Sequence, residues 1–284
     1  MRTSKLVSAS IHGAWVFVIG IAAATIALAA TPAALTNGAK YVSLGSSFAA
    51  GPGIPAQQPS CGRSDHNYPH LVAAALGLKL VDVSCSGATT ANILDTPQGD
   101  AAPQMAALTR DTMLVTVTIG GNDISYSAST IKCGGAAVAD HCAGTLDQAR
   151  IAEAVSRLPA RLDAMLAAIR AKAPQAIIVL VPYPRVVPLQ DQRCMELGLV
   201  ADDANYFAAL GQQLENVLVN AASSQPVLVA DPYVRSAGHG PCADAANRWV
   251  NGAKPAGSGA SFHPTANGHS EMARLVLAAL GVAN

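Results

Sequence analysis

Short apolar segments alternate with longer amphipathic ones along most of this chain. The apolar segments cover residues 40–44, 78–83, 112–119, 176–181 and 227–230. Each is followed by Gly, Ser, Pro or Asp, residues that commonly follow buried strands. Apolar positions at helical spacing predict helices over residues 68–76, 147–172, 202–222 and 265–280. In the longest of these helices, Pro159 is expected to cause a kink or to split the helix in two.

The order of these elements predicts the fold class. Near-continuous apolar strands that alternate with helices indicate a parallel sheet covered on both faces. We therefore expect an α/β protein, a three-layer α/β/α sandwich with a central five-stranded parallel sheet. Ligands of such sheets bind beyond the carboxyl ends of the strands. Ser47 follows the first predicted strand and Asn122 follows the third, so both should lie at that edge.

The amino terminus resembles an export signal. Arg2 and Lys5 precede an uncharged stretch over residues 14–30, which ends in the small-x-small sequence Ala27-Leu28-Ala29. We expect residues 1–30 to be a signal peptide and residues 31–284 to form a single domain. The apolar run approaches the roughly 17 to 25 residues of a membrane span, so an uncleaved amino-terminal anchor is the alternative.

Composition narrows the classes of function. With 284 residues, of which 51% are hydrophobic and 13% charged, the chain suits one sizeable core and a single, monomeric domain. Its 18 basic and 18 acidic residues give a net charge of zero, and no Lys or Arg run is present. A nucleic-acid partner is therefore not expected.

Six cysteines follow the predicted signal, and an even number in an exported chain favours disulfides. Fifteen pairings are possible for six cysteines. Sequential pairing closes the shortest loops, and it is our prediction: Cys61 with Cys85, Cys133 with Cys142, and Cys194 with Cys242. No Cys-x-x-Cys pair is present, which makes zinc a weak alternative, and we expect neither a metal nor another cofactor.

Three histidines outside the candidate chemistry are expected to have ordinary structural roles. His66 and His70 have the spacing of metal ligands on one helix face, but Pro69 interrupts it, so surface or loop positions are expected. His269 is expected to face solvent or to cap a turn in the last helix.

Three short segments can supply a nucleophile, a base and an amide donor. They contain Ser47, His263 and Asn122, the last within Gly120-Gly121-Asn122-Asp123. A serine hydroxyl needs an imidazole to take its proton, and the carbonyl that it attacks needs donors for the developing oxyanion. The combination indicates a serine acyl hydrolase.

Four segments together resemble a known family: Tyr41-Val42-Ser43-Leu44-Gly45-Ser46-Ser47, Cys85-Ser86-Gly87-Ala88-Thr89, Gly120-Gly121-Asn122-Asp123 and Phe262-His263-Pro264. Their order and spacing are similar to the four sequence blocks of the SGNH hydrolases, also called GDSL lipases and esterases. The secreted actinobacterial members, which have three sequential disulfides, are especially similar. The resemblance implies a flavodoxin-like fold with Ser47 as nucleophile and His263 as base. It also implies that the backbone N–H groups of Ser47 and Gly87 and the side-chain amide of Asn122 form the oxyanion hole.

The chain departs from the family pattern at two positions. Ser46 stands where the family usually has aspartate before the nucleophile, and Ala260 stands where it has the acid that orients the histidine. A main-chain carbonyl of Ala260 or Ser261 can accept the imidazole N–H instead, as in some secreted relatives. Asp231 or Asp244, reaching in from a loop, is the competing source. Without a nearby carboxylate, the pKa of His263 should lie at or below its ordinary value.

The predicted function is an exported serine ester hydrolase that cleaves carboxylic, and by preference fatty-acyl, esters. Low charge and only 4% aromatic residues favour acyl esters over sugars as substrates. They are also compatible with transient contact with a membrane or lipid interface. A cell-wall polysaccharide O-acetyl esterase is one alternative. A non-enzymatic secreted binding module that keeps the fold is the other, because two expected acids are absent.

Overall fold

The computed structural model describes Met1 and residues 35–135, 141–189 and 193–282. The predicted signal peptide falls on residues outside this range, apart from Met1. In the part of the chain that is described, no helix has both the length and the apolar character needed to cross a membrane.

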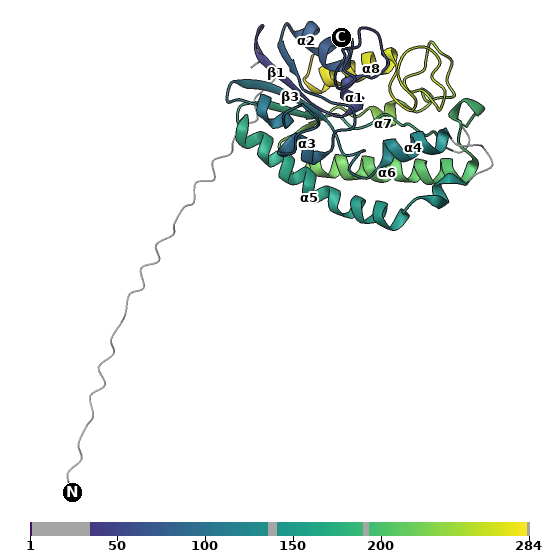
Figure 1. Ribbon diagram of the computed structural model, residues 1–284. Coiled ribbons are helices and arrows are strands. Elements are labelled where there is room, and N and C mark those ends of the chain that lie inside the picture. Colours follow the sequence, from purple (N-terminus) through teal and green to yellow (C-terminus); the bar gives the residue numbers. More distant parts are fainter. Residues whose placement is uncertain (2–34, 136–140, 190–192, 283–284) are drawn as a thin grey trace.

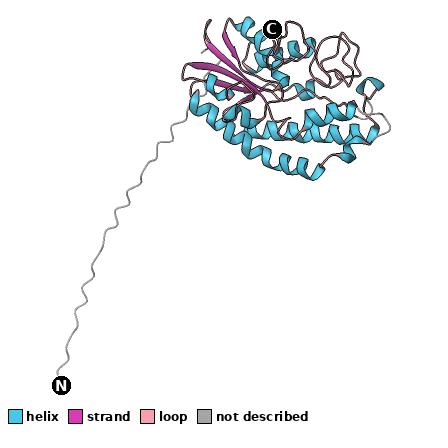
Figure 2. Ribbon diagram, viewed as in Figure 1, coloured by secondary structure: helices cyan, strands magenta, loops and turns pink. Residues whose placement is uncertain are grey.

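A five-stranded sheet in the order β2-β1-β3-β4-β5 forms the centre of the molecule, and all of its pairings are parallel. The strands are β1 (Lys40–Gly45), β2 (Lys79–Asp82), β3 (Thr112–Thr118), β4 (Ile177–Leu180) and β5 (Leu228–Val229). The predicted fold class is confirmed, since each strand lies within or overlaps a predicted apolar segment (Figure 2).

Helices cover both faces of the sheet (Figure 1), and successive residues of β1 pack against different layers. Tyr41 packs with α2 (Tyr68–Leu76) and α8 (Ala266–Ala279) on one face. Val42 and Leu44 pack on the other face with α3 (Thr90–Leu94), α5 (Gln148–Lys172) and α6 (Ala201–Ser223). Residues on both faces of β1, β3 and β4 are buried, which explains why these three strands are mostly apolar, whereas the edge strands β2 and β5 are partly exposed.

Shorter elements carry the loops that surround the sheet. They are α1 (Ser47–Ala50), α4 (Tyr126–Gly134), α7 (Pro232–Arg235) and the 3₁₀ turns Gln104–Ala107, Cys142–Thr145 and Met195–Leu197. None of them was predicted, because they are too short or too polar to show helical periodicity.

Pro159 lies within one continuous helix. Of the two expected outcomes, a kink or a division into two helices, the division is therefore wrong. A proline inside a helix costs about 3 kcal/mol. Leu158 and Leu162, on either side of it, are fully buried against the sheet. Each such side chain contributes about 1.5–3 kcal/mol, so the apolar face of the helix offsets the loss of one hydrogen bond.

His269 is fully buried, and the expectation that it faces solvent or caps a turn in the last helix is wrong. Its Nδ1 accepts the backbone N–H of Tyr68 at 3.2 Å, which ties α8 to the first turn of α2. Burial lowers the pKa of His269 to about 3, so the ring stays neutral and Nδ1 remains an acceptor.

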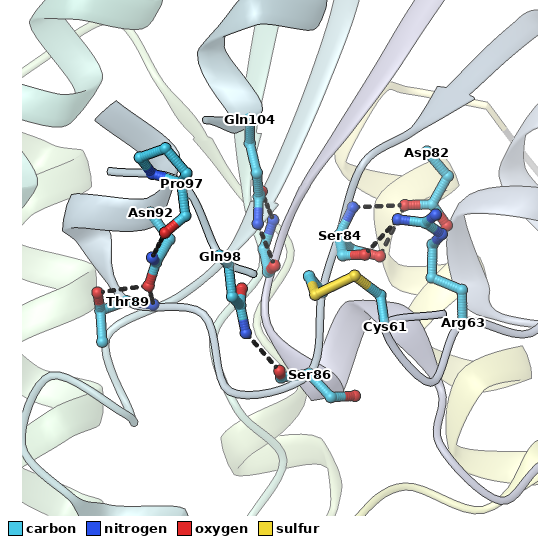
Figure 3. The surroundings of a disulfide bond; sticks show 12 residues. Cys61, Arg63, Asp82, Ser84, Ser86, Thr89, Asn92, Pro97, Gln98 and Gln104 are labelled. Atoms are coloured by element: carbon cyan, nitrogen blue, oxygen red, sulfur yellow. Dashed lines mark hydrogen bonds between the residues drawn. A yellow bond between two sulfur atoms is a disulfide. The ribbon is translucent and has the colours of Figure 1, made fainter. Parts of the chain in front are cut away.

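The three sequential disulfides are present, as predicted. Cys61–Cys85 joins the loop after α1 to the loop after β2, close to Gln104 and Gln98 (Figure 3). Cys194–Cys242 ties together two long loops that follow β4 and β5. Each bridge contributes about 2–4 kcal/mol, mainly by restricting the unfolded chain.

Glu215, a buried carboxyl on α6, forms no ion pair with any described residue. Glu215 is 6% exposed, and its Oε2 makes no hydrogen bond to any described residue. Burial raises the pKa of Glu215 to about 8, and the nearby Asp231 carboxylate adds to the shift. The folded protein therefore holds a proton there that the unfolded chain releases near the ordinary value of 4.5. The stability that this proton contributes is fully present below the ordinary value of 4.5, and it is lost as the pH rises to about 8.

Glu215→Gln should remove this loss of stability, because the amide never ionises. The difference in melting temperature, variant minus wild type, should increase by about 2–4 °C between about pH 5 and pH 8.5. A change of about 1 kcal/mol produces a shift of this size in a domain of this length. Calorimetry across the pH range measures it. Glu196→Gln, at an exposed position, is the control. A difference that does not change with pH would contradict the assignment.

Candidate active site

Ser47 lies at a sharp turn where β1 meets α1. The strand ends at Gly45, and the backbone N–H of Ser46 donates to the carbonyl of Thr118 at 2.9 Å. The short helix α1 then begins with Ser47, which is 5% exposed. The turn places the serine hydroxyl at the carboxyl edge of the sheet, where ligand sites of parallel sheets lie.

The structure brings His263 to this serine from the far end of the chain. His263 Nε2 lies 2.7 Å from Ser47 Oγ, across a separation of 216 residues. The imidazole also packs against the ring of Phe48, with 4.8 Å between the centroids. A hydrogen bond of this length lets the imidazole accept the proton of the serine as the hydroxyl attacks.

A main-chain carbonyl occupies the other nitrogen of the imidazole. His263 Nδ1 lies 2.7 Å from the carbonyl oxygen of Ser261. The carbonyl of Ala260 instead accepts the backbone N–H of His263 at 3.2 Å. Between these residues, Phe262 adopts a left-handed backbone with φ of 54°, an uncommon conformation for a large side chain. The turn aims the Ser261 carbonyl back at the ring.

Neither of the two candidate acids takes this place among the described residues. The carboxylate of Asp231 accepts the backbone N–H of Tyr233 at 2.7 Å and caps α7. Asp244 is exposed on its loop, and no hydrogen bond or ion pair joins it to His263.

Burial lowers the pKa of His263 below its ordinary value, and the bond to the Ser261 carbonyl opposes the shift only in part. A carboxylate at this position would favour the charged ring, whereas a neutral carbonyl does so weakly. The imidazole is therefore neutral, and able to act as a base, at neutral pH.

Gly87 and Asn122, the two expected oxyanion donors outside the Ser47 turn, lie on neighbouring loops. Asn122 Nδ2 donates to the carbonyl of Ala88 at 2.9 Å, which joins the loop after β3 to the one that contains Gly87. An amide nitrogen carries two hydrogens, so one remains for a ligand. Ser86, next to Gly87, is held by both of its backbone groups. Gln98 Nε2 donates to the Ser86 carbonyl at 2.8 Å (Figure 3), and the Ser86 N–H donates to the carbonyl of Cys61 at 2.9 Å.

Asp123 connects the same two loops with stronger bonds. Its side chain is almost fully buried and accepts both the backbone N–H and the hydroxyl of Thr90, the first residue of α3. Arg161 lies 3.5 Å from the carboxylate. Burial raises the pKa of Asp123, against the effect of these partners.

Gln104 supports the strand end that precedes Ser47, and its local sequence carries no signal for this role. Its Oε1 accepts the N–H of Gly45 at 2.7 Å, and its Nε2 donates to the carbonyl of Gly45 at 2.9 Å (Figure 3). The side-chain amide thus pairs with both backbone groups of Gly45. The partners are 59 residues apart, which is why only the structure reveals the pair.

Comparisons with known proteins identify the family of this chain. The family model of the GDSL-like Lipase/Acylhydrolase family matches residues 43–270, a segment that includes Ser47, Gly87, Asn122 and His263. Lipase 2 of Streptomyces coelicolor is 33% identical over 290 residues, covering 98% of this chain and 97% of that protein.

Two solved structures have the same fold over most of their length. Phospholipase A1 from Streptomyces albidoflavus NA297 has a TM-score of 0.71 at 30% identity and covers 85% of this chain and 99% of its own. The extracellular lipase from Streptomyces rimosus has a TM-score of 0.70 at 31% identity, covering 84% and 99%. The chain therefore belongs to the GDSL-like lipase/acylhydrolase family and is a carboxylic ester hydrolase.

Proposed function

We propose that this protein hydrolyses carboxylic esters, by preference fatty-acyl esters, through an acyl-enzyme on Ser47 with His263 as the base. The observation that carries the proposal is the 2.7 Å contact between Ser47 Oγ and His263 Nε2. The Ser261 carbonyl at Nδ1 supports it, because the bond fixes the tautomer in which Nε2 is free to accept a proton.

In the first half of the reaction, Ser47 Oγ attacks the acyl carbon while His263 Nε2 takes the hydroxyl proton. The carbonyl oxygen becomes an oxyanion, which the N–H groups of Ser47 and Gly87 and the amide of Asn122 stabilise. Loss of one such donor typically costs about 2.7–4 kcal/mol of transition-state stabilisation. When the tetrahedral intermediate collapses, the C–O bond to the alcohol breaks, and His263 returns the proton to the alcohol oxygen.

In the second half, water attacks the acyl-enzyme by the same route. His263 removes a proton from the water, the new oxyanion uses the same donors, and collapse releases the carboxylic acid with the proton returned to Ser47. The chemistry requires no group beyond these residues and water.

The preference for fatty-acyl esters rests on several features together. A cavity of about 390 Å³ adjoins Asn122, and its lining is mixed: Leu146, Ile151 and Ala154 lie beside Asp123, Ser125, Ser129, Asp147 and Arg150. Its size is within the range of small-molecule sites, about 300–1,000 Å³. The chain is only 4% aromatic, so it has few platforms for stacking sugars. The proteins similar to this chain include lipases and a phospholipase A1.

We place this activity outside the cytoplasm. Three disulfides within the described residues suit an oxidising compartment. The amino-terminal pattern over residues 1–30 suits a signal peptide that is removed, which leaves residues 31–284 as one hydrolase domain.

Ser47→Ala should abolish turnover of p-nitrophenyl esters, lowering kcat by at least about 10³-fold, because nothing else supplies the nucleophile. A series from acetate to palmitate, measured with wild type, gives the acyl preference, which we expect to favour the longer chains. Ser60→Ala, at an exposed serine, is the control. Equal activity of wild type and Ser47→Ala would remove the nucleophile assignment, and a maximum at acetate would favour an O-acetyl esterase.

The pH dependence of kcat/KM should follow His263. Only the neutral imidazole is a base, and burial lowers its pKa from 6.5, so the acid limb of the profile should have its midpoint below pH 6.5. Initial rates with an uncharged ester across the acid range measure it. A midpoint at or above pH 7 would show that a negative charge faces the ring.

Asp231→Asn and Asp244→Asn should each leave kcat within about threefold of wild type, since a carbonyl rather than a carboxylate orients the base. For comparison, changing the carboxylate of a serine protease triad to an amide lowers kcat about 10⁴-fold. Asn also remains a good cap at position 231. A loss of several hundredfold in either variant would overturn the role of the Ser261 carbonyl.

A further inference from the structure

Tyr183 lies in the loop after β4, is 3% exposed, and contacts three segments of the site at once. Its hydroxyl oxygen accepts the backbone N–H of Gly121 at 3.0 Å. The same hydroxyl lies 3.4 Å from Ser46 Oγ. Its ring packs edge-on against Phe48, with 4.6 Å between the centroids.

Each of these partners adjoins a different part of the proposed machinery. Ser46 immediately precedes Ser47, and Gly121 immediately precedes Asn122. Phe48 packs on the imidazole of His263, at 4.8 Å. One side chain thus touches the neighbours of the nucleophile, of the amide donor and of the base.

We propose that Tyr183 is a positioning residue that fixes the spacing between the Ser47 turn and the Asn122 loop. It touches no reacting atom and acts through Ser46, Gly121 and Phe48. This inference rests on the proposed function, because it assigns Tyr183 a part in holding that same site.

The hydrogen-bond directions support a bridge rather than two separate contacts. The phenol oxygen accepts from Gly121, so the phenol proton is free for Ser46 Oγ, which stands where the family usually has an aspartate. Burial raises the pKa of Tyr183 to about 12, so the hydroxyl keeps this proton over the working range of the enzyme.

The absence of a side chain at Gly121 lets the tyrosine approach. A Cβ there would lie 3.0 Å from both the hydroxyl oxygen and Cζ of Tyr183, closer than ordinary contact. The tyrosine and the loop are therefore fitted to each other, and the contact leaves little freedom for the Asn122 segment. Displacements of about 1 Å in an active site can cost about 10² in rate.

Tyr183→Phe separates the hydroxyl from the ring, because the packing on Phe48 is kept. We expect kcat for a p-nitrophenyl ester to fall about 10- to 100-fold while KM stays within about twofold. This pattern is the one produced when an interaction that stabilises only the transition state is lost. The acid limb of the pH profile should not move, since the hydroxyl does not bond to His263.

Tyr41→Phe is the matched control. Its hydroxyl is also fully buried and bonds to Thr116 Oγ1 at 2.7 Å, but it lies on the sheet face covered by α2 and α8, and it contacts none of the proposed site residues. Both variants should lose thermal stability, and only Tyr183→Phe should lose kcat when both are assayed well below their melting temperatures.

Three results would overturn the positioning role: a kcat of Tyr183→Phe within about twofold of wild type, an equal loss of kcat in Tyr41→Phe, or a shifted acid limb in Tyr183→Phe. These differ from a failure of the proposed function, which would appear in wild type as absent turnover, or as turnover that Ser47→Ala does not remove.

Discussion

The parallel pairing of β1 with both β2 and β3 is the constraint on which the site depends. Because these three strands point the same way, the loops that leave their carboxyl ends meet at one edge of the sheet. Ser47, Gly87 and Asn122 lie on those three loops. Register matters as much as order: Gly45 pairs with Thr118 at the end of β1, and a slip by one residue would turn every side chain to the opposite face. The buried alternation of the strands therefore fixes the place of Ser47, the proposed nucleophile, as firmly as any contact within the site.

His263 reaches the same edge by a different route, because no strand of the sheet leads directly to it. Its loop is shaped by Asn251, whose side-chain amide donates to the carbonyls of Ser258 and Gly259 at 2.8 and 3.0 Å. The N–H of Gly259 then donates to the carbonyl of Gly53 at 2.9 Å, and Gly53 lies three residues after the end of α1. A Cβ on Gly53 would lie 2.8 Å from backbone atoms of this loop, so the two chains approach as closely as they do only because the residue is glycine. The loop of His263, the proposed base, is thus tied to the segment that carries Ser47, the proposed nucleophile.

The sequence predicts the strands, the long helices and the family residues because each has a local signature, either a period of apolar positions or a short motif. It does not predict features that depend on distant partners. The choice between the Ala260 and Ser261 carbonyls depends on the left-handed backbone of Phe262, which no propensity favours. Tyr183 lies in a proline-rich loop, and its hydrogen-bond partners are 62 and 137 residues away, so its sequence context indicates only a loop aromatic. His269 follows the helical period, yet burial against α2 rather than its polarity decides its environment.

In the proposed mechanism, replacing the orienting acid by a carbonyl changes the energetics of the base more than its geometry. A carbonyl dipole fixes the tautomer as a carboxylate would, but it attracts the imidazolium less, because it carries no net charge. The cost falls on the transition state, in which His263 is becoming positive. The gain is that the free base resists protonation, since its pKa is lowered by burial and no carboxylate raises it. With less help for the imidazolium, more of the stabilisation must come from the donors around the oxyanion. Their placement by Asp123, Gln104 and Tyr183 is consistent with that demand, because preorganised donors are effective only when their loops cannot move.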